Sequence, residues 1–160
     1  MTAPLPIPQN DDRPPESRAG DVAAPGLSPF IVGIGTDIIE CDRIEKMLAK
    51  HGDLFRQRVF TDQEIEYCSI RKAAPQHFAG RWAAKEAALK AIGTGWAKGI
   101  QWTDIEVVNQ VGGKPVLKLH NAGLTVAQER GIREILISIS HCKAYAIAYA
   151  MAVGNAENRK

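Results

Sequence analysis

The sequence predicts an α+β protein with a mainly antiparallel sheet packed against helices. Two observations support this fold class. Apolar runs typical of strands alternate along the chain with segments of helical periodicity. Two short β-rich runs also flank a pair of glycines, as in a hairpin, and two further β-rich runs follow near the C-terminus. No internal repeat is present, so we expect one α+β domain.

The domain boundaries follow from composition. The chain has 160 residues, of which 45% are hydrophobic and 24% charged, which is typical of one globular domain. Seven of the nine prolines lie within residues 1–30, without hydrophobic periodicity. Such a segment buries too little apolar surface to offset its ordering entropy. We therefore expect a flexible leader over residues 1–29, a folded domain over 30–155 and a short tail over 156–160.

The remaining composition favours a soluble protein of the cytoplasm. The three cysteines (Cys41, Cys68 and Cys142) form neither an even disulfide set nor a metal-binding pair. No signal or transit peptide is evident. The longest apolar run, residues 144–153, has about half the length that a membrane span requires. We expect reduced thiols and no membrane association.

The first half of the domain contains one strand and three helices. Residues 30–39 form an apolar run that predicts a strand. After it, apolar residues recur at helical spacing from Cys41 to Leu48. The sequence from Thr61 to Glu64 is a capping box, which starts a second helix. An alanine-rich run over residues 76–92 predicts a longer helix, which Gly93 ends.

The second half is richer in strands. Residues 105–108 and 116–119 flank Gly112-Gly113 as a hairpin, and a helix over 121–130 stops at Gly131. Residues 135–140 and 145–153 predict two more strands. In the last run, alanine occupies every second position from 144 to 152. This alternation places the alanines on one face of the strand, where a helix can approach the sheet closely.

The long helix contains the first candidate for chemistry. Phe78, Trp82 and Leu89 define its apolar stripe, and Lys85 and Glu86 lie on the flanks of that stripe. A carboxylate near a core boundary needs a cation, a metal ion or several hydrogen bonds. The alternative is an ordinary surface ion pair between Glu86 and Lys90 at i,i+4 spacing.

Asp37 and His141 are the other candidates. Asp37 follows Gly-Thr at the end of an apolar strand, although it could simply cap the next helix. His141 lies between two strands, where a structural role is the common alternative. Two carboxylates on different elements, a histidine and basic groups near glycine turns suit Mg²⁺-assisted phosphoryl chemistry.

Five blocks of sequence, in this order, resemble those of holo-acyl-carrier-protein synthases, the short single-domain type of 4′-phosphopantetheinyl transferase. The blocks span residues 33–44, 58–64, 78–95, 113–115 and 138–146. The block around Lys85-Glu86 is the most diagnostic. The leader is the one departure, because short family members lack it.

The resemblance implies a compact α+β fold that forms a homotrimer, with active sites between neighbouring subunits. It implies Asp37 and Glu86 as Mg²⁺ ligands and His141 near the phosphates of coenzyme A. The remaining residues on the coenzyme A side would be Lys90, Gly93, Thr94, Gly95, Lys114 and Pro115. Arg43 and the helix after it would meet the acyl carrier protein.

The implied reaction transfers 4′-phosphopantetheine from coenzyme A to a serine of apo acyl carrier protein and releases 3′,5′-ADP. Lys90, with Lys85 as a second candidate, would add positive charge. Glu86, directly or through a metal-bound water, is the favoured acceptor of the serine proton, and His141 is its competitor. Whether the carrier serves fatty acid or polyketide synthesis stays open.

The charge of residues 43–58 agrees with an acidic partner. Five basic and two acidic residues give this segment a net charge of +3. Its expected partner-binding residues are Arg43, Met47, Lys50 and Arg56. A solvated basic face is the alternative reading of such a run.

Other functions fit the sequence less well. A non-catalytic carrier-binding module has no need of paired metal ligands. A nucleic-acid-binding domain is disfavoured because aromatics make up only 6% of the chain. Gly93-Thr94-Gly95 lacks the P-loop pattern, and a Cys142 nucleophile paired with His141 fails because neighbours on an extended chain point to opposite faces. The larger two-repeat transferases require a longer chain.

Overall fold

The computed structural model describes residues 29–96 and 98–155. The predicted leader, apart from Pro29, and the predicted tail lie outside these residues. The elements run in the order β1 (Pro29–Glu40), α1 (Cys41–Val59), α2 (Asp62–Ser69), α3 (Ala74–Ile92), η1 (Trp102–Asp104), β2 (Ile105–Asn109), β3 (Pro115–Leu119), α4 (Asn121–Glu129), β4 (Ile132–His141) and β5 (Tyr145–Asn155). These confirm the predicted α+β class.

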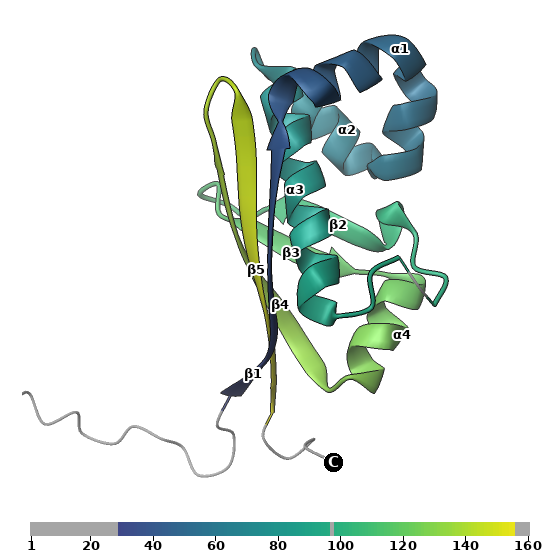
Figure 1. Ribbon diagram of the computed structural model, residues 1–160, viewed down its shortest axis with the longest axis vertical. Helices are drawn as coiled ribbons and strands as arrows, with labels where there is room; N and C mark the ends of the chain where they lie inside the picture. Colours follow the sequence, from purple (N-terminus) through teal and green to yellow (C-terminus); the bar gives the residue numbers. More distant parts are fainter. Residues whose placement is uncertain (1–28, 97, 156–160) are drawn as a thin grey trace, which may run out of the picture.

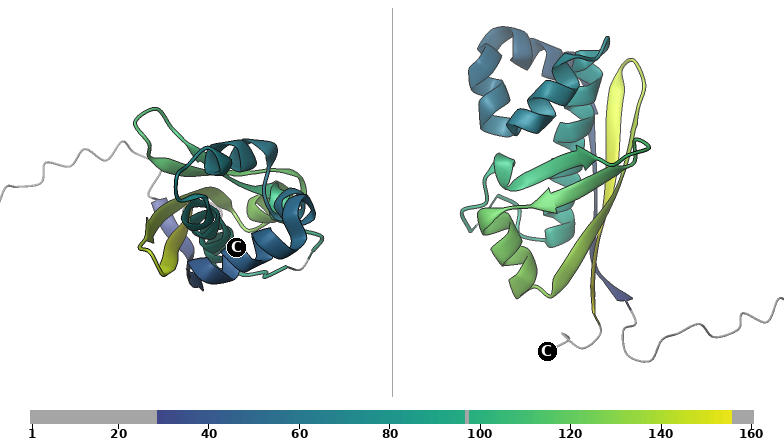
Figure 2. Two further views of the ribbon diagram at one scale, coloured as in Figure 1. Left: turned by 90° about the horizontal axis from the view of Figure 1, so that it is seen from above. Right: turned by 180° about the vertical axis from the view of Figure 1, so that it is seen from behind.

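Two antiparallel sheets flank the central helix. β1, β5 and β4 form a three-stranded sheet with β5 in the middle, and β2 and β3 form a separate hairpin. Figure 1 shows α3 lying along one face of the larger sheet, with α1 and α2 at one end of it. The view from behind shows the hairpin crossing α3 on the side away from β1 (Figure 2). α3 is therefore covered on most of its sides.

Small residues allow α3 to lie directly on the sheet. The alanines of β5 that face α3, at positions 146, 148, 150 and 152, are all buried. On β1, a Cβ atom added to Gly33 would lie 2.2 Å from the carbonyl oxygen of Ala91. One added to Gly35 would lie 2.1 Å from that of Ala87. The predicted close approach of a helix to the alanine face is confirmed.

The opposite face of this sheet is apolar and uncovered. Ile34, Met151 and Leu136 pair in one row across the three strands. They are 69%, 37% and 45% exposed, respectively. Tyr149 is also exposed there, and the face is hollowed by a cavity of about 620 Å³. A sheet face of this kind is unusual on a monomer surface.

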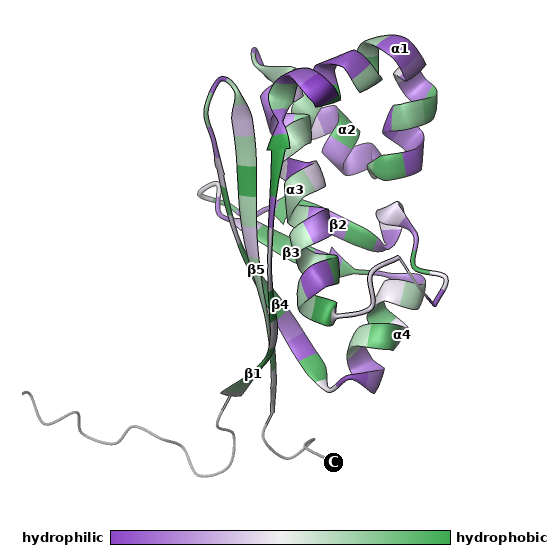
Figure 3. Cartoon of the chain, viewed as in Figure 1, coloured by the Kyte–Doolittle hydropathy of each residue, from purple (hydrophilic) through white to green (hydrophobic). Residues whose placement is uncertain are grey.

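α1 is amphipathic but not continuous. Hydrophilic and hydrophobic residues alternate along it (Figure 3), and it buries Ile44 and Phe55. Its helical geometry is interrupted at Gly52, which has φ 52° and ψ −129°. α1 therefore consists of two helical stretches with different directions.

Candidate functional site

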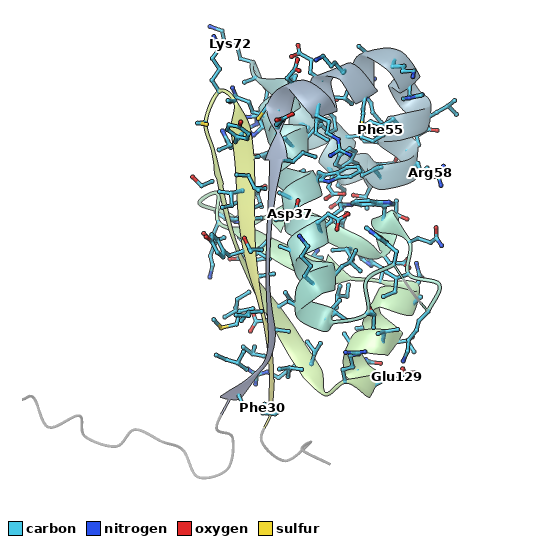
Figure 4. All side chains as sticks on the ribbon, viewed as in Figure 1. Phe30, Asp37, Phe55, Arg58, Lys72 and Glu129 are labelled. Carbon is cyan, nitrogen blue, oxygen red and sulfur yellow. The ribbon has the colours of Figure 1, made fainter. Side chains whose placement is uncertain are left out.

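The packing of β1 on α3 places Asp37 against the helix that carries Glu86 and Lys90. Gly33 of β1 lies against Ala91 of α3, and Gly35 lies against Ala87, one turn earlier in the helix. Asp37 lies two residues further on the same side of the strand, so it faces one turn further toward the start of α3. That level of α3, residues 83–87, includes Glu86. Figure 4 shows Asp37 beside α3.

Lys90 is the ion-pair partner of Asp37. Its Nζ atom donates to Asp37 Oδ1 at 2.8 Å and to the carbonyl oxygen of Thr36 at 2.9 Å. The Asp37 side chain is only 17% exposed. The alternative pairing of Lys90 with Glu86 is therefore wrong. The alternative that Asp37 caps a helix is also wrong, because the N-cap residue of α1 is Glu40.

Glu86 is half-buried and has a partner that the sequence analysis missed. Its Oε1 atom accepts a hydrogen bond from Trp96 Nε1 at 3.3 Å. Trp96 follows directly after Gly93-Thr94-Gly95, the glycine turn expected to line the coenzyme A site. Thus Lys90 contacts Asp37 across the interface of α3 with β1, and Glu86, one turn earlier on α3, contacts the residue that follows the glycine turn.

Lys85 takes no part in this group. It is fully buried, and its Nζ atom lies 2.7 Å from Glu64 Oε2. It also donates to the carbonyl oxygens of Val59 at 2.7 Å and Trp102 at 3.0 Å. The expectation that Lys85 lies on the flank of an apolar stripe and adds charge to the site is therefore wrong, because α3 is buried on most sides.

A second polar group lies near the start of α3. A cavity of about 190 Å³ is lined by polar side chains and by the hairpin turn between β2 and β3. Its lining residues are Tyr67, His77, Gly80, Arg81, Asn109, Gly113, Pro115, Ile139 and His141. Of the residues predicted for the coenzyme A side, Pro115 and His141 line this cavity, and Lys114 lies exposed between Gly113 and Pro115.

Arg81 is the dominant charge of this cavity. It is only 5% exposed, and its Nη2 atom donates to Asn109 Oδ1 at 2.7 Å. Its guanidinium lies 3.9 Å from the centre of the Tyr67 ring. Its buried Nε atom has no hydrogen-bond partner. A buried guanidinium with a free donor is suited to an anionic ligand.

Two histidines complete the cavity. The rings of His77 and His141 lie with their centres 5.3 Å apart. Burial, and secondarily the charge of His141, lower the pKa of His77. The sequence analysis predicted His141 but missed His77, Arg81 and Asn109. Arg81 could have been noticed, because it interrupts an apolar run of the long helix four residues before Lys85.

The two polar groups lie on opposite sides of α3. His77 and Glu86 are nine residues apart, which is about 180° around a helix with roughly 100° per residue. Accordingly, Lys90 contacts β1, whereas the cavity is bordered by β4. β1 and β4 are the two edges of the sheet. One chain therefore does not bring His141 together with Asp37 and Glu86.

The predicted partner-binding residues lie in two separate places on the surface. Arg43, Met47 and Lys50 line one surface pocket at the start of α1, together with Glu40, Asp42, Lys46 and His51. Arg56 lies beyond the kink at Gly52 and lines a different groove, where it pairs with Asp53 at 2.9 Å.

The donor set can be compared with the needs of a metal ion. Within residues 29–96 and 98–155, no three His, Cys, Asp or Glu side chains gather as a metal-binding cluster. The carboxylates of Asp37, which is largely buried, and Glu86 are of the kind that fits Mg²⁺, because this ion uses one or two protein carboxylates and completes its shell with water and phosphate oxygens.

Residues 33–150 match the model of the 4′-phosphopantetheinyl transferase superfamily. The chain belongs to this superfamily. The transferase is 47% identical over 120 residues to a holo-acyl-carrier-protein synthase of Protochlamydia amoebophila, an alignment that covers 75% of this chain and 96% of the relative. It is 42% identical over 122 residues to one of Solibacter usitatus, with 76% and 98% covered.

Solved structures agree with these relatives. A holo-ACP synthase from Plasmodium yoelii matches the transferase with a TM-score of 0.69 at 35% identity, over 79% of this chain and 98% of that one. One from Bacillus anthracis, in complex with CoA (3′,5′-ADP), matches with a TM-score of 0.64 at 40% identity, over 78% and 97%. The predicted resemblance to holo-acyl-carrier-protein synthases is confirmed.

Proposed function

We propose that this transferase moves 4′-phosphopantetheine from coenzyme A to a serine of an apo acyl carrier protein, with Mg²⁺ as cofactor and 3′,5′-ADP as the leaving product. The relatives named as synthases of holo carrier protein support the reaction, and the Bacillus anthracis complex supports the donor. The observation that carries the proposal is the ion pair between Lys90 and Asp37, which ties β1 to the helix that also carries Glu86.

Asp37 and Glu86 are the proposed ligands of Mg²⁺. When bound, the ion neutralises the charge of the coenzyme A diphosphate. Lys90 already lies against Asp37 Oδ1 and is half-exposed, so its ammonium group can reach a phosphate oxygen placed there. Gly93, Thr94 and Gly95 follow Lys90 at the end of α3 and border the same space.

The chemical step breaks one phosphorus–oxygen bond and forms another. The serine oxygen attacks the phosphorus that bears pantetheine, and the bond to the 3′,5′-ADP phosphate breaks. We assign the serine proton to the Glu86 carboxylate, because Glu86 lies in the same group as Asp37 and Lys90, whereas His141 of the same chain lies across α3. A metal-saturated Glu86→Gln variant with normal turnover would contradict this assignment; His141→Ala is the variant to compare.

The cavity around Arg81 is the proposed site for another phosphate of coenzyme A. Its buried guanidinium has a free Nε donor, and the planar guanidinium group suits phosphate oxygens. Lys114, Pro115 and His141 would contact the remainder of the nucleotide. The ligand then has one anionic part at Arg81 and another at Lys90.

A second subunit is needed to join the two groups in one site. They lie at opposite edges of the sheet in each chain. The uncovered apolar face formed by Ile34, Leu136, Tyr149 and Met151 offers a surface for self-association. We propose a homotrimer, as the family resemblance implies, in which the Asp37 group of one chain faces the Arg81 cavity of its neighbour. A stable, active monomer in gel filtration would contradict this assembly.

The basic surface of α1 is the proposed docking site for the carrier protein. Arg43 and Lys50 lie beside Met47 in a pocket that Glu40 and Asp42 also line, and Lys46 pairs with Asp42 at 2.6 Å. Two basic groups beside an apolar residue suit an acidic helix with an apolar residue at its centre. Arg56 is a weaker candidate, because it lies in a separate groove and is paired with Asp53.

We expect the enzyme to act in the cytoplasm. Among the described residues, no helix is long and apolar enough to cross a membrane.

Mass spectrometry of an apo carrier protein incubated with coenzyme A tests the reaction. We expect the carrier to gain the phosphopantetheine mass only when Mg²⁺ is present. Asp37→Asn should abolish the gain, whereas Glu129→Gln, which alters a surface carboxylate on α4, should not. Mass gain that persists in a metal chelator, or in Asp37→Asn, would overturn the proposed site. A catalytically silent protein that still binds the carrier would instead favour a non-catalytic binding module.

A further inference from the structure

All three tryptophans of the chain stack in one column that ends at Glu86. The ring centres of Trp82 and Trp102 lie 4.3 Å apart, and those of Trp102 and Trp96 lie 4.0 Å apart. Phe55 of α1, labelled in Figure 4, stacks on Trp82 at 5.9 Å. The last ring, that of Trp96, donates its indole N–H to Glu86 Oε1. The column thus links the core of the protein to a proposed metal ligand.

The inner part of the column is firmly anchored. Trp82 belongs to α3, and the carbonyl oxygen of Trp102 accepts a hydrogen bond from the buried ammonium group of Lys85. Asp104, two residues after Trp102, is 3% exposed and accepts hydrogen bonds from the backbone N–H of Gln101 and the side chain of Asn121, both at 2.9 Å. Trp102 therefore presents a fixed surface.

The outer ring belongs to a loop with little regular structure. Gly93 and Gly95 have φ angles of 81° and 56°, a conformation that glycine adopts more easily than other residues. Trp96 is 39% exposed. Its stacking on Trp102 and its hydrogen bond to Glu86 hold this loop against α3, so the position of the loop and the orientation of the Glu86 carboxylate depend on one another.

We propose that Trp96 is a positioning residue that orients the Glu86 carboxylate for the divalent ion. This inference rests on the proposed function, in which Glu86 binds Mg²⁺. Hydrogen-bond partners of metal-binding side chains typically change metal affinity by 10–100-fold when they are removed. Because the bond here is 3.3 Å long and partly exposed, we expect a loss near the lower limit, about 10-fold.

Indole N–H signals in a ¹H–¹⁵N spectrum test the link itself. Three tryptophans give three signals, which Trp→Phe variants assign. Glu86→Gln should shift the Trp96 signal and leave the Trp82 signal in place, and the control Glu66→Gln, which alters an exposed carboxylate of α2, should shift none. In the wild-type protein, Mn²⁺ should broaden the Trp96 signal most strongly. A Trp96 signal that is insensitive to both Glu86→Gln and Mn²⁺ overturns the proposal.

Metal affinity tests the positioning role without reference to turnover. Mn²⁺ binding, measured by electron paramagnetic resonance, should weaken about 10-fold in Trp96→Phe, which keeps an aromatic ring but lacks the N–H group. Trp82→Phe alters the same column without touching Glu86 and should bind Mn²⁺ as the wild-type protein does. Wild-type affinity in Trp96→Phe, or no Mn²⁺ binding by the wild-type protein, overturns the proposal.

The Mn²⁺-binding results and the test of the proposed reaction can fail independently of one another. If the wild-type protein binds Mn²⁺ with the expected dependence on Trp96 but transfers nothing to an apo carrier protein, the proposed reaction fails and the role of Trp96 stands. If transfer occurs and Trp96→Phe binds Mn²⁺ normally, the reaction stands and the role of Trp96 fails.

Discussion

The Nζ atom of Lys85 lies 2.7 Å from Glu64 Oε2, and both side chains are fully buried. Glu64 also accepts hydrogen bonds from the backbone N–H groups of Val107 at 3.0 Å and Thr61 at 2.9 Å. This ion pair therefore joins α2, α3 and β2. Lys85 has a structural role, although it directly precedes Glu86, a proposed Mg²⁺ ligand.

Removal of one member of this pair should strongly destabilise the fold. Lys85→Met leaves the Glu64 carboxylate buried without its cation, which typically costs about 3–5 kcal/mol. The free energy of unfolding in urea measures this loss. Glu64→Gln should also destabilise, and combining the two substitutions should cost less than the sum of their separate effects. Wild-type stability of Lys85→Met would show that the pair is not buried as described.

Lys90→Met should reduce activity but leave the stability of the fold nearly unchanged. Its pair with Asp37 is half-exposed on the lysine side, and such pairs contribute about 0–1 kcal/mol. The unfolding free energy should therefore change little, whereas kcat/KM for coenzyme A should fall about 10²–10³-fold, as expected when a charge that stabilises a transition state is lost. Lys98→Met, which alters another exposed lysine of this region, is the control and should leave kcat/KM unchanged. A Lys90→Met enzyme with wild-type kcat/KM would exclude Lys90 from the reaction.

Gly35→Ala should force α3 away from β1. The new Cβ atom would lie 2.1 Å from the carbonyl oxygen of Ala87, which cannot move without the helix. Overpacking typically costs 1–3 kcal/mol, and we expect about 3 kcal/mol here. Gly80→Ala is the matched control, because its Cβ would meet only the side-chain end of Ile139 at 3.0 Å. Thermal unfolding compares the two. Equal melting temperatures would contradict the close packing of α3 on β1.

The three free cysteines should differ in reactivity. Backbone hydrogen bonds from Tyr145 and Ala144 lower the pKa of the exposed Cys142 thiol. Burial raises the pKa of Cys68 to about 12. Iodoacetamide at mildly alkaline pH should therefore modify Cys142 first and Cys68 only after unfolding, as measured by peptide mass spectrometry. Modification of Cys68 in the folded protein at the rate of Cys142 would contradict this order.

The shifted pKa of Cys68 also makes a prediction about stability. A thiol in an unfolded chain has a pKa of about 8.5, whereas the Cys68 thiol stays protonated above this pH in the folded protein. A raised pKa in the folded state means that stability is complete below the unfolded value and declines as the pH rises above it. Cys68→Ala should weaken this decline between about pH 8.5 and 10. An unchanged pH dependence would contradict the assignment.

Local patterns in the sequence predicted most of the fold. The alternating alanines identified the face of β5 that packs on α3, and the capping box at Thr61 located the start of α2. Asp37 stood out because it is a carboxylate in an apolar strand. The predicted break between 140 and 145 placed His141 in a connection, whereas it is the last residue of β4. Such differences are expected at the ends of elements.

The structural features that the sequence did not predict depend on contacts between residues far apart in the chain. The burial of Lys85 requires Glu64, which lies 21 residues earlier and on another helix. The cavity at Arg81 requires Asn109 of β2 and His141 of β4. The division of the site residues across α3 follows from its orientation on the sheet. None of these relationships has a signal in the local sequence.

The pairing of Pro29 with Asn155 places the first and last described strand residues side by side. Asp37 lies eight residues along β1 from this end, which is roughly 26 Å of extended chain. Fusion partners or purification tags attached before β1 and after β5 would therefore leave the domain at the same corner, well away from the proposed site. A pair of reporter proteins could be attached at both points at once.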